Sequence, residues 1–326
     1  MAHDVLCLRP RADFERAGAL PPEKLTVEYR KPDDSQLGAL VREARAMVIP
    51  AVGPKLAPAL FDGSRLQLVQ VTGAGLDRLD ETAMKKLGIP VANVPGGSNA
   101  AVAEYAVTSA SLLLRRLAWA DAEIRAGNYA AFRARMLADN LSGLEGLAVG
   151  LIGMGVIGLA VAQAFARSGC RLCYFDPSPR DAAAAAALGA RPVALGALLE
   201  SSDVVSVHVP LLPSTAGLLG ERELASMKAG AVLVQASRGG IVDEKALASQ
   251  LRSGHLGGAA VDVYSSEPPA PDNPLLALDG EAARRLLLTP HIAGVTRQSY
   301  ALLFQGAWTN VERVLLRGEP PLNRVY

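Results

Sequence analysis

Cysteine, histidine and aromatic residues are all scarce in this chain. Its 326 residues include 3 cysteines and 4 histidines, and aromatic side chains make up only 5%. Three cysteines are few, and their number is odd, which argues against a disulfide framework. Cys170 and Cys173 share a C-x-x-C spacing, but they fall on a predicted strand, where residues three apart point to opposite faces. We therefore expect neither a redox pair nor a metal site there.

An excess of one charge and long apolar runs are also missing. The 33 Lys and Arg residues balance 32 Asp and Glu residues to a formal net charge of +1. The sequence has no stripe of basic residues that would indicate nucleic-acid binding, and it has no apolar run long enough to span a bilayer. The first ten residues include Asp4 and Arg9, which is not typical of a secretory signal. We expect a cytoplasmic protein without nucleic-acid or membrane partners.

What the chain does contain is a regular alternation of short apolar runs and helical patterns, which predicts an α/β fold with parallel sheets. A long helix is predicted from Asn99 to about Ala126, followed by a loop that leads to Gly146, and the alanine run Ala182–Ala187 predicts a shorter helix. The predicted strands are Val5–Leu8, Val48–Ile49, Leu68–Val71, Val91–Asn93, Ala148–Ile152, Arg171–Asp176, Val204–His208, Ala231–Gln235, Gly258–Val263 and Leu286–Leu288.

A glycine-rich turn follows the apolar run that ends at Ile152. Gly153, Gly155 and Gly158 form a G-x-G-x-x-G pattern that opens an alanine-rich helix. The first glycine allows a tight turn, the second lets the backbone approach a pyrophosphate, and the third lets helix and strand pack closely. Asp176 ends the next predicted strand, 18 residues beyond Gly158, near the spacing of a carboxylate that binds the ribose of NAD. The alternative is an ordinary glycine turn with a strand-end aspartate.

Three polar side chains lie just beyond the ends of separate predicted strands: Arg238, Glu267 and His291. In open α/β sheets, ligands bind at the carboxyl ends of the strands. Arg can hold a carboxylate in a forked pair, and His can exchange the proton that accompanies hydride transfer. A neighbouring Glu would orient the imidazole and favour its charged form. Taken singly, each residue is equally well explained as an ordinary loop side chain.

With these motifs in order, the whole chain resembles the D-isomer-specific 2-hydroxyacid dehydrogenase family, which includes phosphoglycerate, glycerate and lactate dehydrogenases. The order and spacing of the matching blocks are more specific than any one motif. These blocks are Gly153–Gly158, His208–Pro210, Met227–Gly230, Ser237–Gly239, Val242–Glu244, Asp262–Pro268 and Thr289–Gly294.

The resemblance implies a role for individual residues. Arg238, Glu267 and His291 fall on the catalytic positions of the family. The substrate would contact Arg238, His291 and the segment Gly73, Ala74 and Gly75, in which the backbone N–H groups of Ala74 and Gly75 would bind its carboxylate. The alternative for this segment is an ordinary turn. The implied cofactor-binding positions are Gly153, Gly155, Val156, Ile157, Gly158, Asp176, His208, Val209, Pro210, Thr215, Ala236, Ser237, Arg238, Asp262, His291 and Gly294, with no metal site.

The resemblance also implies the layout. We expect two Rossmann-like, doubly wound parallel-sheet domains, with the nucleotide domain inserted into the substrate domain. The substrate domain would comprise residues 1–98 and 297–326, including a terminal helix over Tyr300–Leu316, and the NAD-binding domain residues 99–296. The implied activity is hydride transfer between NAD(H) and C2 of a small D-2-hydroxy or 2-keto acid such as glyoxylate or hydroxypyruvate. Family members usually form homodimers through their nucleotide domains.

Three departures from the family pattern affect these expectations. Gln235 stands where Asn is frequent, and Val156 stands where the family often has a basic residue after the second glycine. Pro50–Val52 replaces the Arg that phosphoglycerate dehydrogenases carry after the second strand, which weakens the case for a phosphorylated substrate. Two alternatives remain: an NAD-sensing regulatory or corepressor-like protein on the same scaffold, and a phosphite dehydrogenase-like enzyme. Glu267 argues against formate, because the formate-oxidising branch has Gln there.

Overall fold

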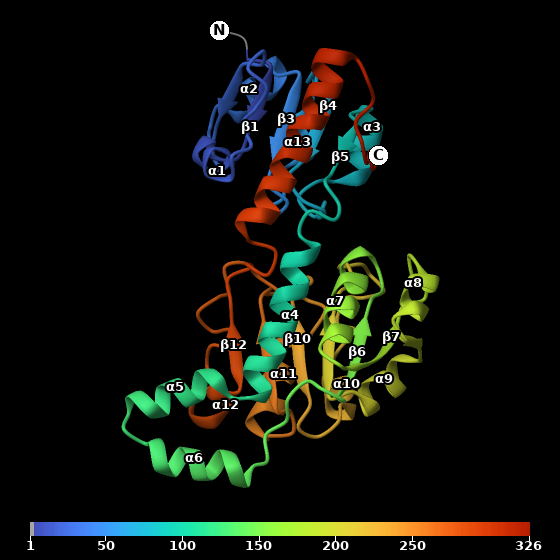
Figure 1. Ribbon diagram of the computed structural model, residues 1–326. Helices are drawn as coiled ribbons and strands as arrows, with labels where there is room; N and C mark the ends of the chain where they lie inside the picture. The colour runs from blue at the N-terminus through green and yellow to red at the C-terminus, as the bar shows by residue number, and fades with distance from the viewer. Residues whose placement is uncertain (1–2) are drawn as a thin grey trace. The chain divides into compact units, whose positions relative to one another are not determined.

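The computed structural model describes residues 3–326, which divide into two compact units (Figure 1). The first unit comprises Met1–Ser98 and Val295–Tyr326, and the second comprises Asn99–Gly294. In residues 3–326 the strands form one sheet of five and one of seven, and all pairings between the named strands are parallel. The expected α/β class with two doubly wound parallel sheets is therefore confirmed. No helix of this described part is long and apolar enough to cross a membrane.

The five-stranded sheet of the first unit has the strand order β2-β1-β3-β4-β5. This is the order of flavodoxin-like doubly wound sheets. Its strands are β1 (Val5–Cys7), β2 (Val27–Tyr29), β3 (Ala46–Ile49), β4 (Leu68–Val71) and β5 (Val91–Ala92). Its helices are α1 (Arg11–Ala17), α2 (Leu37–Glu43), the 3₁₀-helix η1 (Pro58–Phe61), α3 (Glu81–Leu87) and α13 (Arg297–Arg317).

Each face of this sheet carries its own hydrophobic core. Phe14 of α1 and Phe304 and Trp308 of α13 pack on one face, whereas α2, η1 and α3 cover the other with residues such as Phe61 and Met84. The aromatic rings of Phe14 and Phe304 lie 4.7 Å apart, so α1 and α13 share one aromatic cluster. Beyond α13 the chain returns to the sheet, where residue 324 forms an antiparallel bridge with residue 92 of β5.

The seven-stranded sheet of the second unit has the order β12-β11-β10-β9-β6-β7-β8, which is the Rossmann order extended by one strand. Its strands are β6 (Ala148–Ile152), β7 (Arg171–Phe175), β8 (Arg191–Pro192), β9 (Val204–Val207), β10 (Val232–Gln235), β11 (Gly258–Val261) and β12 (Leu286–Leu288). Its helices are α4 (Asn99–Leu114), α5 (Leu117–Arg125), α6 (Tyr129–Ala138), α7 (Val156–Arg167), α8 (Ala182–Ala187), α9 (Leu195–Ser201), α10 (Glu221–Ser226), α11 (Glu244–Arg252) and α12 (Gly280–Arg284).

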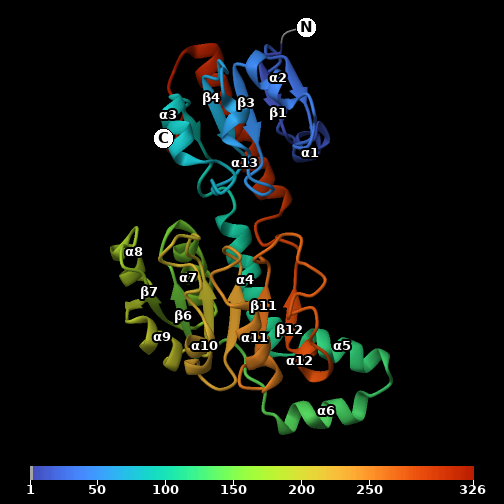
Figure 2. The ribbon, with the colours of Figure 1, turned by 180° about the vertical axis from the view of Figure 1, so that it is seen from behind.

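Helices cover both faces of this second sheet, as a parallel sheet requires. In the view of Figure 1, α4 and α7 lie in front of the strands, and the reverse view of Figure 2 shows α10 and α11 in front. Neighbouring strand residues divide between the two layers: Leu151 packs with α4 and α7, and Ile152 packs with the α9–α11 layer. The sheet is therefore buried on both faces, and the polar side chains of the candidate site lie at the carboxyl ends of its strands.

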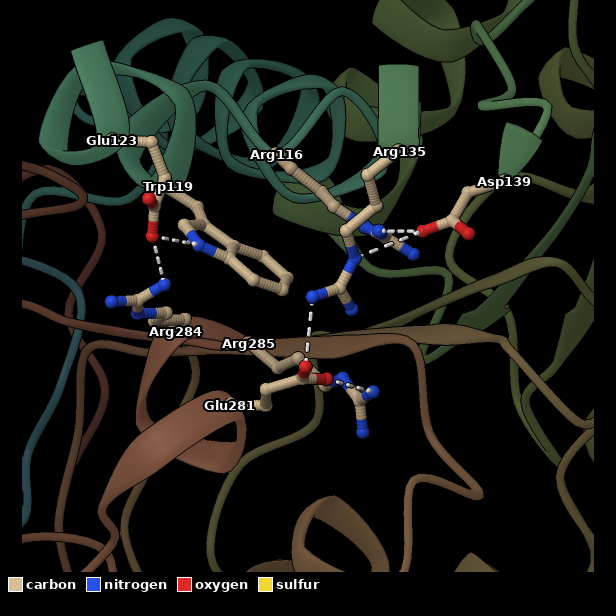
Figure 3. Close-up of polar contacts among 8 residues, drawn as sticks. All are labelled: Arg116, Trp119, Glu123, Arg135, Asp139, Glu281, Arg284 and Arg285. Carbon is tan, nitrogen blue, oxygen red and sulfur yellow. Dashed lines mark hydrogen bonds and ion pairs between the residues drawn. The ribbon is translucent and has the colours of Figure 1, made fainter. Parts of the chain in front are cut away.

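Two expectations about residues 99–146 are wrong. The predicted single helix to Ala126 is broken into α4 and α5 at Arg116, whose backbone adopts a left-handed φ of 51°. The predicted loop after it contains α6. Arg116, Arg135 and Arg284 surround the buried indole of Trp119 (Figure 3), with guanidinium-to-centroid distances of 5.5, 4.5 and 5.3 Å. This cation–π cluster ties α5 and α6 to α12, a tertiary contact that local sequence patterns do not reveal.

The remaining differences concern short elements and element ends. The predictions omit the three-residue strand β2 and the two-residue strand β8, both at sheet edges. Neither edge strand is fully buried, so neither carries a strong apolar pattern. Most other strands end within one or two residues of the expected positions, and the terminal helix α13 is longer than expected at both ends.

Candidate active site

The glycine-rich turn links β6 to α7. Gly153 has a φ of +97°, and a side chain there would lie 2.8 Å from the backbone of His208. A side chain at Gly158 would lie 2.1 Å from the carbonyl oxygen of Gly153. A side chain at Gly155, by contrast, would meet nothing within 4 Å. Packing thus requires glycine at 153 and 158. Gly155 borders open space at the start of a 12-residue helix, where backbone N–H groups attract anions.

Asp176 directly follows β7, and its side chain contacts this turn. One of its carboxylate oxygens accepts a hydrogen bond from the N–H of Met154 at 2.6 Å, and the other accepts one from Ser178 at 2.8 Å. Each oxygen keeps a further lone pair. The carboxylate is therefore fixed beside the turn and can still accept a hydrogen bond from a ribose hydroxyl.

His208 lies where the strand order reverses, between β6 and β9. Its N–H donates to the carbonyl oxygen of Ile152 at 2.7 Å, and its Nε2 lies 2.8 Å from the hydroxyl of Ser206. Burial lowers the pKa of His208 to about 4, so the ring is neutral at physiological pH. Among residues 3–326 its Nδ1 is a buried nitrogen without a hydrogen-bond partner. An orphaned nitrogen beside an open glycine turn fits a bound dinucleotide.

The other residues assigned to the cofactor lie at the same carboxyl-end edge of the sheet. Val209 and Pro210 continue from His208, and the hydroxyl of Thr215 donates to the carbonyl oxygen of Pro210 at 2.5 Å, which closes that loop. Ala236 and Ser237 directly follow β10, Val156 and Ile157 begin α7, and Gly294 ends the second unit.

His291 and Glu267 contact each other directly. Nδ1 of His291 lies 2.8 Å from Oε2 of Glu267, whose other oxygen accepts a hydrogen bond from the N–H of Tyr264 at 3.2 Å. Their side chains are 24% and 30% exposed, so this pair is accessible from solvent. The carboxylate fixes the ring orientation and leaves Nε2 as the nitrogen that can exchange a proton with a ligand.

Asp262 holds the loop that carries His291. Its buried carboxylate accepts hydrogen bonds from the hydroxyl of Thr289 at 2.6 Å and from the N–H groups of Ile292 and Ala293, each at 2.8 Å. Its own carbonyl oxygen accepts the N–H of His291 at 2.8 Å. In this structure Asp262 therefore supports the His291 loop, whereas the resemblance implies a cofactor contact.

Arg238 lies at the end of the neighbouring strand β10. Its guanidinium donates to the carbonyl oxygen of Ser237 at 2.7 Å, and the amide of the buried Gln235 donates to the carbonyl oxygen of Arg238 at 2.9 Å. A side chain at Gly239 would lie 1.8 Å from the carbonyl oxygen of Tyr264, so the Arg238 loop packs directly on the loop that leads to Glu267. The adjacent strands β10, β11 and β12 thus bring all three predicted catalytic residues to one edge.

Gly73, Ala74 and Gly75 belong to the first unit and follow β4 at the carboxyl edge of its sheet. A side chain at Gly73 would lie 2.7 Å from the side chain of Ala51, so this turn packs closely on the loop after β3.

Several supporting residues escape sequence reasoning. Arg78 is 2% exposed and donates to the carbonyl oxygens of Pro54 at 2.8 Å and Pro50 at 3.2 Å, which braces the loop after β3. Glu244 likewise holds the loop before Glu267 through Ser265. These side chains bind loops that are distant in sequence. The only available signals were that Glu244 lies within the block Val242–Glu244 and that Arg78 lies three residues after Gly75.

Cys170 and Cys173 do not meet. The thiol of Cys170 donates to the carbonyl oxygen of Leu144 at 3.2 Å, whereas the sulfur of Cys173 lies 3.7 Å from the hydroxyl of Ser202. They pack in the two opposite layers of the second unit, and both are free thiols. Burial raises the pKa of each thiol, which disfavours the reactive thiolate.

Known proteins match both units. The chain is 34% identical to the glyoxylate reductase of Korarchaeum cryptofilum over 313 residues, which cover 96% of this chain and 89% of that protein. It is 35% identical to the D-3-phosphoglycerate dehydrogenase of Archaeoglobus fulgidus over 80% of this chain and 48% of that protein, so it spans about half the length of this relative. The crystal structure of the TT0316 protein from Thermus thermophilus superposes with a TM-score of 0.84 at 31% identity, covering 99% and 100% of the two chains.

The family described as D-isomer specific 2-hydroxyacid dehydrogenase, NAD binding domain, matches residues 107–293. That range covers the glycine-rich turn and the strand ends that carry Arg238, Glu267 and His291. The chain therefore belongs to the D-isomer-specific 2-hydroxyacid dehydrogenase family, and its second unit is the NAD-binding domain of that family.

Proposed function

We propose that this protein is an NAD-dependent oxidoreductase that transfers a hydride between NAD(H) and C2 of a small D-2-hydroxy or 2-keto acid. The observation that carries the proposal is the 2.8 Å contact between His291 and Glu267, at the same sheet edge as Arg238 and the open glycine turn. An acid–base pair, a carboxylate-binding cation and a dinucleotide turn are the parts that this reaction needs.

In the proposed mechanism, the nicotinamide supplies or accepts the hydride when it is bound. Arg238 binds the substrate carboxylate and polarises the keto oxygen next to it. His291, oriented by Glu267, donates a proton from Nε2 to that oxygen during reduction and takes it back during oxidation. Asp262 and Gln235 keep the two loops in place through the hydrogen bonds described above.

The proposed substrate is small and unphosphorylated, with glyoxylate and hydroxypyruvate as the leading examples. The backbone N–H groups of Ala74 and Gly75 in the first unit are proposed to bind its carboxylate. Pro50–Val52 offers no cation for a phosphate, and the guanidinium of Arg78 donates to backbone carbonyls of the same loop. The similarity to a glyoxylate reductase over 96% of this chain supports the same substrate class.

The proposed cofactor preference is NAD over NADP. The carboxylate of Asp176 is fixed beside the turn by Met154 and Ser178. A negative charge at this place accepts a ribose hydroxyl and repels a 2′-phosphate.

The test is the loss of NADH or NADPH absorbance with a panel of glyoxylate, hydroxypyruvate, pyruvate, phenylpyruvate and 3-phosphohydroxypyruvate, and the reverse reaction with each D- and L-2-hydroxy acid. We expect turnover of an unphosphorylated keto acid, a preference for NADH and oxidation of the D-isomer. Binding of NADH without turnover of any member contradicts an enzymatic role and favours a regulatory protein on this scaffold. Oxidation of phosphite in a parallel assay, in place of keto-acid reduction, would indicate the phosphite-oxidising alternative.

We also propose that the protein acts in the cytoplasm as a homodimer formed through its NAD-binding unit. Support comes from large apolar side chains that α5 and α6 expose, including Leu117, Tyr129 and Leu137, which are 50%, 63% and 65% exposed. Sedimentation velocity is expected to give twice the chain mass of 34.0 kDa, and a monomer at micromolar concentration would contradict the proposal.

A further inference from the structure

The proposed carboxylate-binding loop presents two successive backbone N–H groups, those of Ala74 and Gly75. Within residues 3–326, neither group donates a hydrogen bond to the protein. Ala74 is exposed and Gly75 is half-buried, so both groups are within reach of a ligand. Successive free N–H groups form a concave site for an anion, but only if their peptide planes are held in a fixed orientation.

The carbonyl groups of the same two peptides are bound from the opposite side by the segment that follows β5. The side-chain amide of Asn93 donates to the carbonyl oxygen of Ala74 at 2.8 Å. The backbone N–H of Val94 donates to the carbonyl oxygen of Gly73 at 2.9 Å.

These two hydrogen bonds set the direction of the ligand-binding N–H groups. A trans peptide is planar, and its C=O and N–H groups point to opposite sides. The carbonyl of Gly73 shares a peptide with the N–H of Ala74, and the carbonyl of Ala74 shares one with the N–H of Gly75. Binding both carbonyls on the β5 side therefore turns both N–H groups away from β5.

The segment that provides the two donors is itself held firmly. Val94 packs against Gly306 of α13 so closely that a side chain at Gly306 would lie 2.8 Å from the side chain of Val94. Gly97 packs in the same way on Leu303, where a side chain would lie 2.6 Å away. The donors of Asn93 and Val94 are thus anchored to α13 and do not depend on the loop that they orient.

We infer that Asn93 is a positioning residue for substrate binding: its side-chain amide holds the Ala74–Gly75 peptide so that the N–H of Gly75 faces the carboxylate of a 2-keto acid. The inference rests on the proposed function and adds a positioning residue to it. Asn93 acts only through this peptide, so it affects carboxylate affinity and leaves the acid–base step and the cofactor site unchanged. The Val94 contact comes from the backbone and survives any substitution of the Asn93 side chain.

The test compares Asn93→Ala and the isosteric Asn93→Asp with the wild-type enzyme on its best keto acid. Asn93→Ala is expected to raise KM roughly three- to tenfold, as for the loss of one neutral hydrogen bond. Asn93→Asp is expected to raise KM further, because an ionised carboxylate repels both the Ala74 carbonyl oxygen and the anionic substrate. The inhibition constant of oxamate, a non-reacting analogue with the same carboxylate, should rise by the same factors, while kcat and the Kd of NADH stay within about twofold.

Thr309→Ala is the matched control, because it also removes one side-chain hydrogen bond of 2.8 Å to a backbone carbonyl at an exposed position of the same unit. It should leave KM unchanged. Unchanged KM and oxamate inhibition in both Asn93 variants would overturn the inference, and so would a parallel change in kcat and NADH affinity, which indicates a merely structural role. If Asn93→Ala does not fold, the KM and the oxamate inhibition constant of Asn93→Asp alone test the inference. A wild-type enzyme that reduces no keto acid would overturn the proposed function and this inference together.

Discussion

His291 combines a side chain that we propose to be catalytic with an unusual backbone. Its φ of 55° lies in the left-handed region, which few residues other than Gly, Asn, Asp and His adopt. The N–H bond to Asp262 and the ring contact with Glu267 hold it there. A substitution at this position can therefore change the backbone as well as the chemistry, and a test of its role has to separate the two.

His291→Asn separates them, because Asn tolerates the left-handed backbone but cannot act as an acid–base group at neutral pH. We expect kcat to fall by roughly 10²–10⁴-fold with little change in NADH affinity or in the midpoint of urea unfolding. Steady-state kinetics and fluorescence titration with NADH measure these quantities. A variant that retains the wild-type rate would exclude His291 as the proton donor.

His208 predicts a pH dependence of stability in the NAD-binding unit. Its pKa is about 4 in the folded chain, below the ordinary value of 6.5, because burial disfavours the charged ring. Between these two pH values the unfolded chain binds a proton that the folded chain does not. The free energy of unfolding should therefore decrease as the pH falls from 6.5 to 4, by at most about 3 kcal/mol from this residue.

Urea unfolding of the wild type and His208→Asn between pH 7 and pH 4.5 measures this contribution. The wild type should lose more stability over this interval than the variant, which lacks the titrating ring. Since carboxylates titrate in both proteins, only the difference between the two curves reports on His208. Parallel curves would show that the ring is protonated equally in the folded and unfolded chains.

At the residue scale, the sequence locates chemical groups better than it locates their supports. Their places at strand ends pointed to Arg238, Glu267 and His291, and the structure places the last two in direct contact. The bonds from Asn93 to Ala74 and from Ser265 to Glu244 depend instead on which loops lie side by side in the folded chain. No local pattern contains that information.

Among the helices and strands, the sequence likewise predicts some elements and misses others. Buried central strands such as β4 and β6 were predicted to the residue, because continuous apolar runs mark parallel strands that are covered on both faces. The edge strands β2 and β8 are short and incompletely buried, and they escaped prediction. The break between α4 and α5 escaped as well, because it depends on how Trp119 packs against arginines from three segments of the chain.

The Trp119 cluster predicts how α5 and α6 are held. Besides the three guanidinium groups, Glu123 accepts a hydrogen bond from the indole N–H at 3.0 Å, and Glu281 of α12 pairs with Arg135 of α6 at 2.8 Å (Figure 3). Trp119→Ala removes the centre of this cluster, at a cost of about 3–5 kcal/mol for a buried Trp. We expect α5 and α6 to detach locally and trypsin to cleave faster at Arg125 and Arg135.

Limited proteolysis followed by mass spectrometry measures this cleavage, with Ile124→Ala as the control because Ile124 is exposed on the same helix. The control should be cut at the wild-type rate, and NADH affinity should be unchanged in both variants. Equal cleavage rates for Trp119→Ala and Ile124→Ala would show that the arginine cluster does not hold these helices.

At the scale of the whole molecule, each unit has hydrophobic cores of its own, and the glycine turn lies entirely within the second unit. We therefore predict that NAD⁺ stabilises the second unit selectively. At a hundredfold excess over its Kd, the gain is about 2.7 kcal/mol. Each unit contains one of the two tryptophans, Trp119 in the second and Trp308 in the first, so two single-tryptophan variants can report on the units separately.

Trp119→Phe leaves the signal of the first unit, and Trp308→Phe leaves that of the second. Thermal unfolding followed by tryptophan fluorescence should show a rise in Tm with NAD⁺ only in Trp308→Phe. An equal rise in both variants would mean that the units unfold as one cooperative block.

The antiparallel bridge between residues 92 and 324 has a consequence for the behaviour of the protein in solution. The N–H of Val91 donates to the carbonyl oxygen of Tyr326, and the N–H of Val325 donates back to Val91, both at 2.8 Å. Without these partners, β5 would present unpaired backbone groups at the sheet margin, where a strand from another molecule could attach. The final residues thus cover this edge of the sheet, and a chain without them would be prone to edge-to-edge association in concentrated solution.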